Sequence, residues 1–380
     1  MQLRKLLVLA MAAGFAHVGV AADASPWPTG IDTANGWQLG VKALLQYDSN
    51  QFDDDRLPNG SDRFDDAQTW RRKEVNLYAR KQGVLTISAG YDFEARSWLD
   101  DYVAVETGAG RFRLGQFKTP VGWEDGNISS DATTFLERTL PEQAVNEGRR
   151  VGLEWLYGGL PKWLFQAAAF GRHDLNNDAA GNTVAARAVY TPILEKGRVL
   201  HLGLSASREW RDDRTARVRA RPEVALTPVR LVDTGTLQGV DHVDRLGLEA
   251  AWIDGPLLLQ GEYLALHAAR PYVSDYRTDG GYVSGSWLLT GESRGYKAGA
   301  ISNPTPRHDW GALEIALRYA TLDLDDGGVA GGREHDWTLG VNWYLGTHFK
   351  LQANYIRAFS DRGNLPLDPT IVALRAQLAF

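Results

Sequence analysis

From about residue 37 onward, apolar and polar residues alternate along successive segments of the chain. In one segment Trp337, Leu339 and Val341 share one parity, and the polar Thr338 and Asn342 fall on the other. Successive side chains of a strand point to opposite faces, whereas an amphipathic helix places apolar residues three and four positions apart. The pattern therefore predicts β-strands with one apolar face and one polar face.

About sixteen such segments follow one another, which predicts an all-β chain of antiparallel strands. Their predicted starts lie near Trp37, Trp70, Gly83, Ser97, Gly110, Arg150, Trp163, Thr183, Arg198, Val243, Pro256, Gly280, Gly311, Glu334, His348 and Pro369. Short connections such as 82–83 and 254–255 alternate loosely with long ones, as periplasmic turns and external loops do in outer-membrane barrels. A closed barrel of about 16 strands leaves an aqueous channel rather than a filled core.

A soluble β-sandwich also alternates, and three features favour a transmembrane barrel instead. Trp and Tyr lie near segment ends, as aromatic girdles at the membrane interfaces require. The polar face carries Arg, Lys, Glu, Gln and Asn, which is too polar for a packed interior but suits a water-filled one. The last segment places Val372, Leu374 and Phe380 on one side and Arg375 on the other, a pattern typical of outer-membrane barrels. In lipid, strands satisfy their backbone groups only when the barrel closes.

The first residues have the pattern of a targeting segment. Arg4 and Lys5 precede an apolar run from Leu6 to Ala16 and a small-residue cleavage site near residue 21. We expect residues 1–22 to be a removed signal peptide and residues 23–380 to form one outer-membrane barrel domain. Removal of the two basic residues would take the formal net charge from -6 to -8, because residues 1–22 hold no acidic residue. An acidic mature chain argues against a nucleic-acid partner.

Three long interruptions break the strand pattern, at residues 49–69, 119–149 and 211–242. The first is rich in Asp, which indicates an exposed or cation-binding loop. The second is too long to be a structureless loop inside a compact domain unless it has a task. We expect it to fold into the barrel and constrict the lumen.

The third interruption holds arginines at every second position, namely Arg217, Arg219 and Arg221. In an extended chain these side chains would form one column, with the small Val218 and Ala220 turned away. Guanidinium groups that close together repel one another, so the column suits a wet place where anions pass. The alternative is a solvated external loop.

Several stretches resemble the phosphate-selective porin O and P family, and they extend from about residue 37 to residue 380. These stretches are RLGQFKTPVG from Arg113, TFLERTLP from Thr134, RPE from Arg221 with VDTG from Val232, QGEY from Gln260, WLLTGE from Trp287, LRY from Leu317 and VNWY from Val341. The resemblance implies a trimeric sixteen-strand outer-membrane porin that takes up phosphate, polyphosphate or similar anions. Implied partners are small inorganic anions, outer-membrane lipid and the assembly machinery that receives the C-terminal strand.

The family guides anions along an arginine column to an arginine-lined constriction. By resemblance the column corresponds to Arg217, Arg219 and Arg221, and Arg230 extends it. The column is predicted to line the pore and bind the passing anion.

Further family positions correspond to the adjacent Arg71 and Arg72 and to Arg138 in the constriction loop. A regular strand would turn Arg71 and Arg72 to opposite faces, unless one lies at the rim or in a β-bulge. Arg138 beside Glu137 is equally compatible with a surface ion pair. The stretch 122–130 lacks the lysine that phosphate-binding members carry there, and this puts selectivity for phosphate itself in question.

No cofactor, metal site or catalytic site is predicted. The eight histidines show no metal spacing, and the chain has no cysteine. An outer-membrane hydrolase is the alternative function, which esterase activity would reveal. A non-conducting barrel adhesin is a second alternative, and it would need a plugged lumen.

Overall fold

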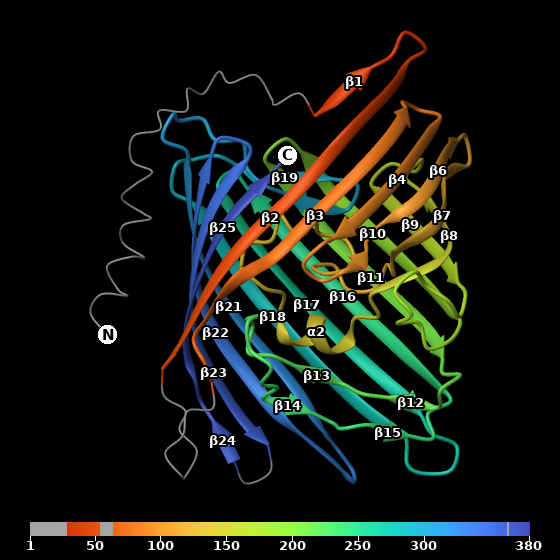
Figure 1. Cartoon of the computed structure of the whole chain (residues 1–380), viewed down its shortest axis with the longest axis vertical. Helices are drawn as coiled ribbons and strands as arrows, with labels where there is room; N and C mark the ends of the chain where they lie inside the picture. The colour runs from red at the N-terminus through yellow and green to blue at the C-terminus, as the bar shows by residue number, and fades with distance from the viewer. Residues whose placement is uncertain (1–28, 54–63, 363–364) are drawn as a thin grey trace.

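A computed structural model describes residues 29–53, 64–362 and 365–380, so the predicted signal peptide lies outside the described residues. These residues form a closed antiparallel barrel of sixteen strands (Figure 1). Its strands are β2(Trp37–Asp53), β3(Ala67–Lys81), β4(Leu85–Asp92), β6(Asp101–Thr107), β7(Gly110–Lys118), β8(Arg149–Tyr157), β9(Trp163–Phe170), β10(Thr183–Glu195), β11(Arg198–Trp210), β16(His242–Asp254), β17(Leu257–Ala269), β18(Tyr276–Leu288), β21(Ala312–Asp326), β22(Val329–Leu345), β23(Phe349–Arg362) and β25(Thr370–Ala379). Within the described ranges no helix has the length and apolarity needed to cross a membrane.

The barrel closes where β25 pairs with β2. The Ala43 N–H donates to the Phe380 carbonyl at 2.9 Å, and the Phe380 N–H donates to the Ala43 carbonyl at 3.1 Å. Beyond this point the short β1(Gly30–Asp32) takes over the pairing with β2, where the Val41 N–H donates to the Thr29 carbonyl at 2.7 Å. Both ends of the described chain therefore lie along one edge of β2.

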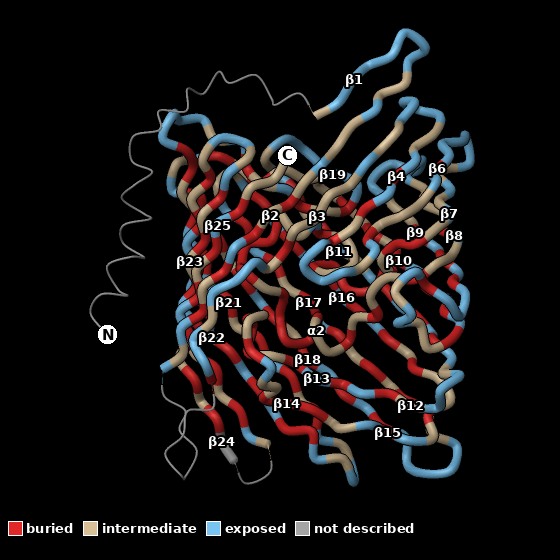
Figure 2. Tube along the Cα trace, viewed as in Figure 1, coloured by how far each residue is buried: buried red, intermediate tan, exposed pale blue. Residues whose placement is uncertain are grey.

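The alternation along the strands follows the sequence prediction. Leu317 and Leu339 point outward and are about half exposed, at 50% and 52%, whereas the intervening Arg318 and Thr338 point inward and are buried. Figure 2 shows the buried positions inside the barrel body and the exposed ones at the turns of both rims. The predicted all-β class and sixteen-strand barrel are confirmed.

Three predicted strand starts lie four or five residues from the observed ones. The strand expected at Gly280 begins at Tyr276. The strand expected at Glu334 begins at Val329, because β21 and β22 continue past the apolar belt and close in a two-residue Gly-Gly turn. The strand expected at Ser97 is only β5(Ser97–Trp98), and the barrel strand β6 follows it. The acidic interruption expected at 49–69 is shorter, since β2 and β3 extend into it. Its residues 54–63 lie outside the described ranges.

Three segments fold into the barrel. The constriction loop, residues 119–148, carries α2(Leu140–Val145) and crosses the lumen in Figure 1. The arginine segment, residues 211–241, carries β12(Thr215–Ala216), β13(Arg219–Ala220), β14(Val232–Asp233) and β15(Leu237–Gln238). The third, residues 289–311, carries β19(Gly295–Lys297) and β20(Ala300–Ser302). It starts from the rim at which the chain ends, the terminal rim, where the sequence pattern predicted only short turns.

Candidate functional site

The inward polar residues of β22, β23 and β25 hold the backbone of the constriction loop. Lys350 donates from Nζ to the Asp131 carbonyl at 2.7 Å, and Asn342 donates from Nδ2 to the Thr134 carbonyl at 2.8 Å. Both side chains are buried, as is Arg375 beside them. The prediction that this polar face borders water was therefore wrong for this wall. Loop carbonyls there take the place of water, because a buried carbonyl needs a donor.

The constriction loop is also held from the terminal rim by residues 289–311. Arg294 forms a bidentate pair with Glu314 at 3.0 and 2.8 Å and donates to the Ala132 carbonyl at 3.1 Å. A second contact joins the same two segments, because Nε1 of Trp123 in the constriction loop donates to the Gly299 carbonyl at 2.7 Å. The strand pattern did not predict that residues 289–311 fold into the barrel. The 23-residue gap between β18 and β21 is the feature of the sequence that could have indicated it.

Arg138 lies in the interior of the constriction loop. Its Nε is 2.5 Å from an oxygen of Asp125, and its Nη2 donates to the Ile128 carbonyl at 3.1 Å. Lys118 donates to the Asp125 carbonyl at 2.6 Å. Arg138 is 8% exposed, so its guanidinium serves the loop's own packing. Glu124, the other acid of the lysine-free stretch, lies 3.5 Å from Arg318 of the wall strand β21.

Charge pairing in this loop also determines its response to acid. Burial opposes ionisation of Asp125, but Lys118 and Arg138 outweigh it and lower its pKa to about 2. Because this pKa lies below the ordinary value of about 3.9, the stabilisation is fully present above that value. It is lost as the pH falls through about 2. The pairing of Asp125 with Lys118 and Arg138 should therefore persist across the ordinary pH range.

We expect Asp125→Asn to loosen the constriction loop. The substitution leaves the buried Arg138 without its countercharge, a loss of about 3–5 kcal/mol for a buried pair. Single-channel recordings should show larger current fluctuations and a higher mean conductance. Asp309→Asn, an exposed residue of the terminal-rim segment, makes the same change of charge and serves as the control. Equal recordings from both variants would contradict the assigned role.

A β-bulge lets two adjacent arginines enter the lumen. In the pairing of β2 with β3, Gln46 lies opposite Arg72 and the next residue, Tyr47, lies opposite Trp70. Arg71 is therefore the extra residue of the bulge. A regular strand would turn Arg71 and Arg72 to opposite faces, but the bulge turns both to the same side.

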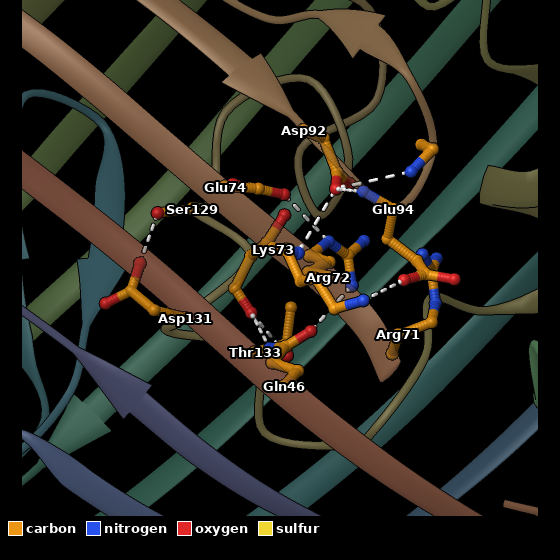
Figure 3. Close-up of polar contacts among 12 residues, drawn as sticks. Gln46, Arg71, Arg72, Lys73, Glu74, Asp92, Glu94, Ser129, Asp131 and Thr133 are labelled. Carbon is orange, nitrogen blue, oxygen red and sulfur yellow. Dashed lines mark hydrogen bonds and ion pairs between the residues drawn. The ribbon is translucent and has the colours of Figure 1, made fainter. Parts of the chain in front are cut away.

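The contacts of these two arginines differ, and Figure 3 shows those of Arg72 with Glu74 and Gln46. Arg72 is buried, pairs with Glu74 at 3.0 Å and donates to Gln46 Oε1 at 2.9 Å, so its charge is used within the wall. Arg71 reaches the constriction loop and forms a bidentate pair with Glu137 at 2.9 and 3.1 Å. Only Arg71 is thus placed at the boundary between wall and loop.

The arginine segment displays its column toward the lumen. Short pairings of β12 with β15 and of β13 with β14 keep it extended. Val218 and Ala220 are buried in a cluster with apolar residues of the barrel wall, whereas the alternating Arg217 and Arg219 are exposed. The small residues anchor the segment, and their spacing turns the arginines to the opposite face.

The column is only partly neutralised. Arg217 forms a bidentate pair with Asp233 at 2.8 and 2.5 Å. Arg221 donates from Nε to the Thr227 carbonyl at 2.8 Å. Within the described ranges neither Arg219 nor Arg221 has an ion pair. The column therefore carries more positive than negative charge.

Arg230 lies close enough to the column to be repelled by its arginines. Burial and repulsion from Arg221 and Arg219 lower its pKa to about 10, despite the attraction of Asp233. Burial and repulsion from Arg71 also lower the pKa of Arg221. These arginines thus form one electrostatic unit, while Arg138 is held inside the constriction loop. Over the described ranges no group of His, Asp or Glu is arranged to hold a metal ion.

This geometry agrees with the comparison with protein families. The model of the family "phosphate-selective porin O and P" matches residues 40–380. The chain belongs to that family. Family membership places the protein in the outer membrane of a Gram-negative bacterium and identifies a channel rather than an enzyme, which contradicts the hydrolase alternative.

Two relatives show the extent of the similarity. Porin O of Pseudomonas aeruginosa is 26% identical over 377 residues, which cover 87% of this chain and 84% of that protein. An uncharacterized protein of Caulobacter vibrioides is 31% identical over 303 residues, or 72% of this chain. The match covers only 60% of the length of the Caulobacter protein.

Solved porins share the fold. The anion-selective porin from Comamonas acidovorans has a TM-score of 0.60 at 14% identity, with 90% of this chain and all of that chain covered. OmpT of Vibrio cholerae in its trimer form also has a TM-score of 0.60, at 12% identity over 91% of this chain and all of that one. At these identities the likeness concerns the barrel fold alone.

Proposed function

We propose that this porin forms a water-filled channel for passive, anion-preferring uptake of phosphate or polyphosphate-like anions. The observation that carries the proposal is the column of Arg217, Arg219 and Arg221, with Arg230 beside it, on the exposed face of an in-folded segment. Guanidinium groups bind phosphate oxygens in a planar, bidentate manner. Successive sites of moderate strength let an anion enter and still leave, as conduction demands.

The net acidity of the chain does not oppose this function. Charges separated by more than about 8–10 Å are screened in physiological salt, so nearby arginines decide the local potential. Two acids of the constriction loop are paired with arginines: Asp125 faces Arg138 of the loop, and Glu137 faces Arg71 of the wall. They are therefore largely neutralised before an anion meets them.

The proposed assembly is a homotrimer in contact with outer-membrane lipid. Strands β4, β6, β7, β8 and β9 have only 7 to 9 residues, whereas β2 and β22 have 17. A transmembrane strand needs about 9–11 residues. The short wall is thus suited to neighbouring subunits rather than to lipid, and the trimer form of Vibrio cholerae OmpT offers a structural precedent.

The proposed preference is tested by reversal potentials of single channels in lipid bilayers. Under a tenfold gradient of potassium chloride, we expect a reversal potential of the sign set by anion flow. A phosphate gradient should give the same sign, and added phosphate should reduce the chloride current. A potential near zero, or of cation sign, would refute the proposal.

A further inference from the structure

A small polar cavity lies beside the arginine column, between the constriction loop, the arginine segment and the wall strands β8, β11 and β16. It has a volume of about 150 Å³, and the residues that define its chemistry are Asn146, Glu147, Arg150, Glu209, Arg211 and Arg245. A water molecule takes about 30 Å³ in the liquid, so the cavity has room for a five-atom oxyanion. Arg217 of the column also lines the cavity, whereas Arg150, Arg211, Arg245 and Asn146 are not among the predicted pore residues.

The arginines of the cavity outnumber its acids. Glu209 is the shared countercharge, at 2.8 Å from Nη2 of Arg245, 3.0 Å from Nη1 of Arg211 and 3.4 Å from Nη2 of Arg150. Glu147 is the second acid of the lining. Burial, together with repulsion from Glu209, outweighs the attraction of Arg245 and raises the pKa of Glu147. Arg211 also lies 3.3 Å from Asp213, and Arg150 lies 3.8 Å from Asp174, but neither of these acids lines the cavity. The lining itself therefore carries more guanidinium groups than carboxylates.

Three N–H donors around the cavity have no hydrogen-bond partner within the described ranges. They are Nε of Arg150, Nη1 of Arg245 and Nδ2 of Asn146. Arg150 and Arg245 are 5% and 8% exposed. The separation of 3.7 Å between Arg245 Nη1 and Glu147 Oε2 is too long for a hydrogen bond. A buried donor without an acceptor is costly, and here three of them border one cavity.

We propose that this cavity is a binding site for a small tetrahedral oxyanion, inorganic phosphate or sulfate, which lies behind Arg217 and does not need Arg219 or Arg221 of the column. Such an ion has four acceptor oxygens directed to different sides, so it can accept from donors on different structural elements at once. Its charge also offsets the excess of guanidinium groups at low dielectric, which a water molecule cannot do. Chloride has no directed oxygens and should compete poorly.

The test is calorimetric titration of the detergent-solubilised protein with sodium phosphate and with sodium sulfate. We expect saturable binding that survives an excess of chloride. Asn146→Asp should weaken it about tenfold or more, since it sets a carboxylate against the anion. It preserves the shape of the side chain and the acceptor for the Gly148 N–H at 2.6 Å. Asn177→Asp makes the same charge change in an exposed loop and should bind as the wild type does.

A second variant covers the case in which Asn146→Asp does not fold. Arg245→Lys keeps the charge and removes the guanidinium fork, and it should also weaken binding about tenfold. Folding of each variant is checked by its faster migration in SDS before boiling. No saturable binding by the wild type, equal displacement by chloride, or unchanged binding by the folded variants would overturn the proposal.

The cavity must also be distinguished from the column. Arg219→Ala with Arg221→Ala removes column charges that do not line the cavity, so oxyanion binding should persist in this double variant. Loss of binding there would assign the ion to the column and overturn the separate site. Anion preference of the pore is measured by reversal potential, so the proposed function and the cavity site can fail independently.

Discussion

Replacement of Arg217, Arg219 and Arg221 by alanine is expected to lower anion-over-cation permeability several-fold and to weaken block by phosphate. A unit charge pair at 4 Å is worth on the order of 1–4 kcal/mol, depending on the effective dielectric. The exchange also leaves Asp233 unpaired, because its bidentate partner is Arg217. A carboxylate then stands in the path that the column had made positive. Reversal potentials in chloride and phosphate gradients measure the effect.

Arg214→Ala is the matched control for the column. Arg214 lies in the same segment but is exposed at its edge, with a left-handed φ of 58°, and pairs with Asp241 at 2.6 Å. Its removal should leave selectivity almost unchanged. If the triple variant keeps the reversal potential of the wild type, the column has no part in selectivity.

Phe380→Asp is expected to prevent assembly of most of the protein into the outer membrane. A charge on the outer face near a rim costs only about 0–1 kcal/mol, so loss of stability alone would be small. The large effect should come from the end of β25, which the assembly machinery receives before the barrel closes against β2. Heat-modifiable migration of membrane fractions measures assembly, and conductance of the few assembled molecules should be normal.

Phe349→Asp is the control for the terminal residue. Phe349 lies opposite Leu378 at the same rim and is exposed on the outer face of β23. It makes the same chemical change one strand away from the chain end. Normal assembly of Phe380→Asp, or equal loss in both variants, would show that the terminal aromatic has no special role.

The sequence predicted those features that depend on side-chain alternation. A period of two places Leu317 and Leu339 on the lipid face, and the same period separates Arg217 and Arg219 from Val218 and Ala220. The spacing needs no knowledge of distant contacts, so the arrangement of the column was predictable before its surroundings were. Whether the column guides anions stays a proposal.

Features that depend on which distant residues meet could not be predicted in this way. Arg138 was expected at the pore, but its partner Asp125 is 13 positions away within a folded loop. The hydrogen bonds that Lys350 and Asn342 donate to the constriction loop join residues more than 200 positions apart in the sequence. Periodicity predicts that such residues face inward, but it does not predict whether they contact water or a folded loop.

The ends of the described chain, Thr29 and Phe380, lie together on β2, and this has a consequence for the order in which the strands are encoded. Thr29 and Phe380 bond to Val41 and Ala43, only two residues apart, or about 7 Å along the strand. A short linker could join these ends, and the chain could be reopened at the exposed Gly327–Gly328 turn between β21 and β22. Such a circular permutant would retain every strand pairing while β25 no longer ends the polypeptide. It would separate what the last strand contributes to the closed barrel from what it contributes as a delivery signal.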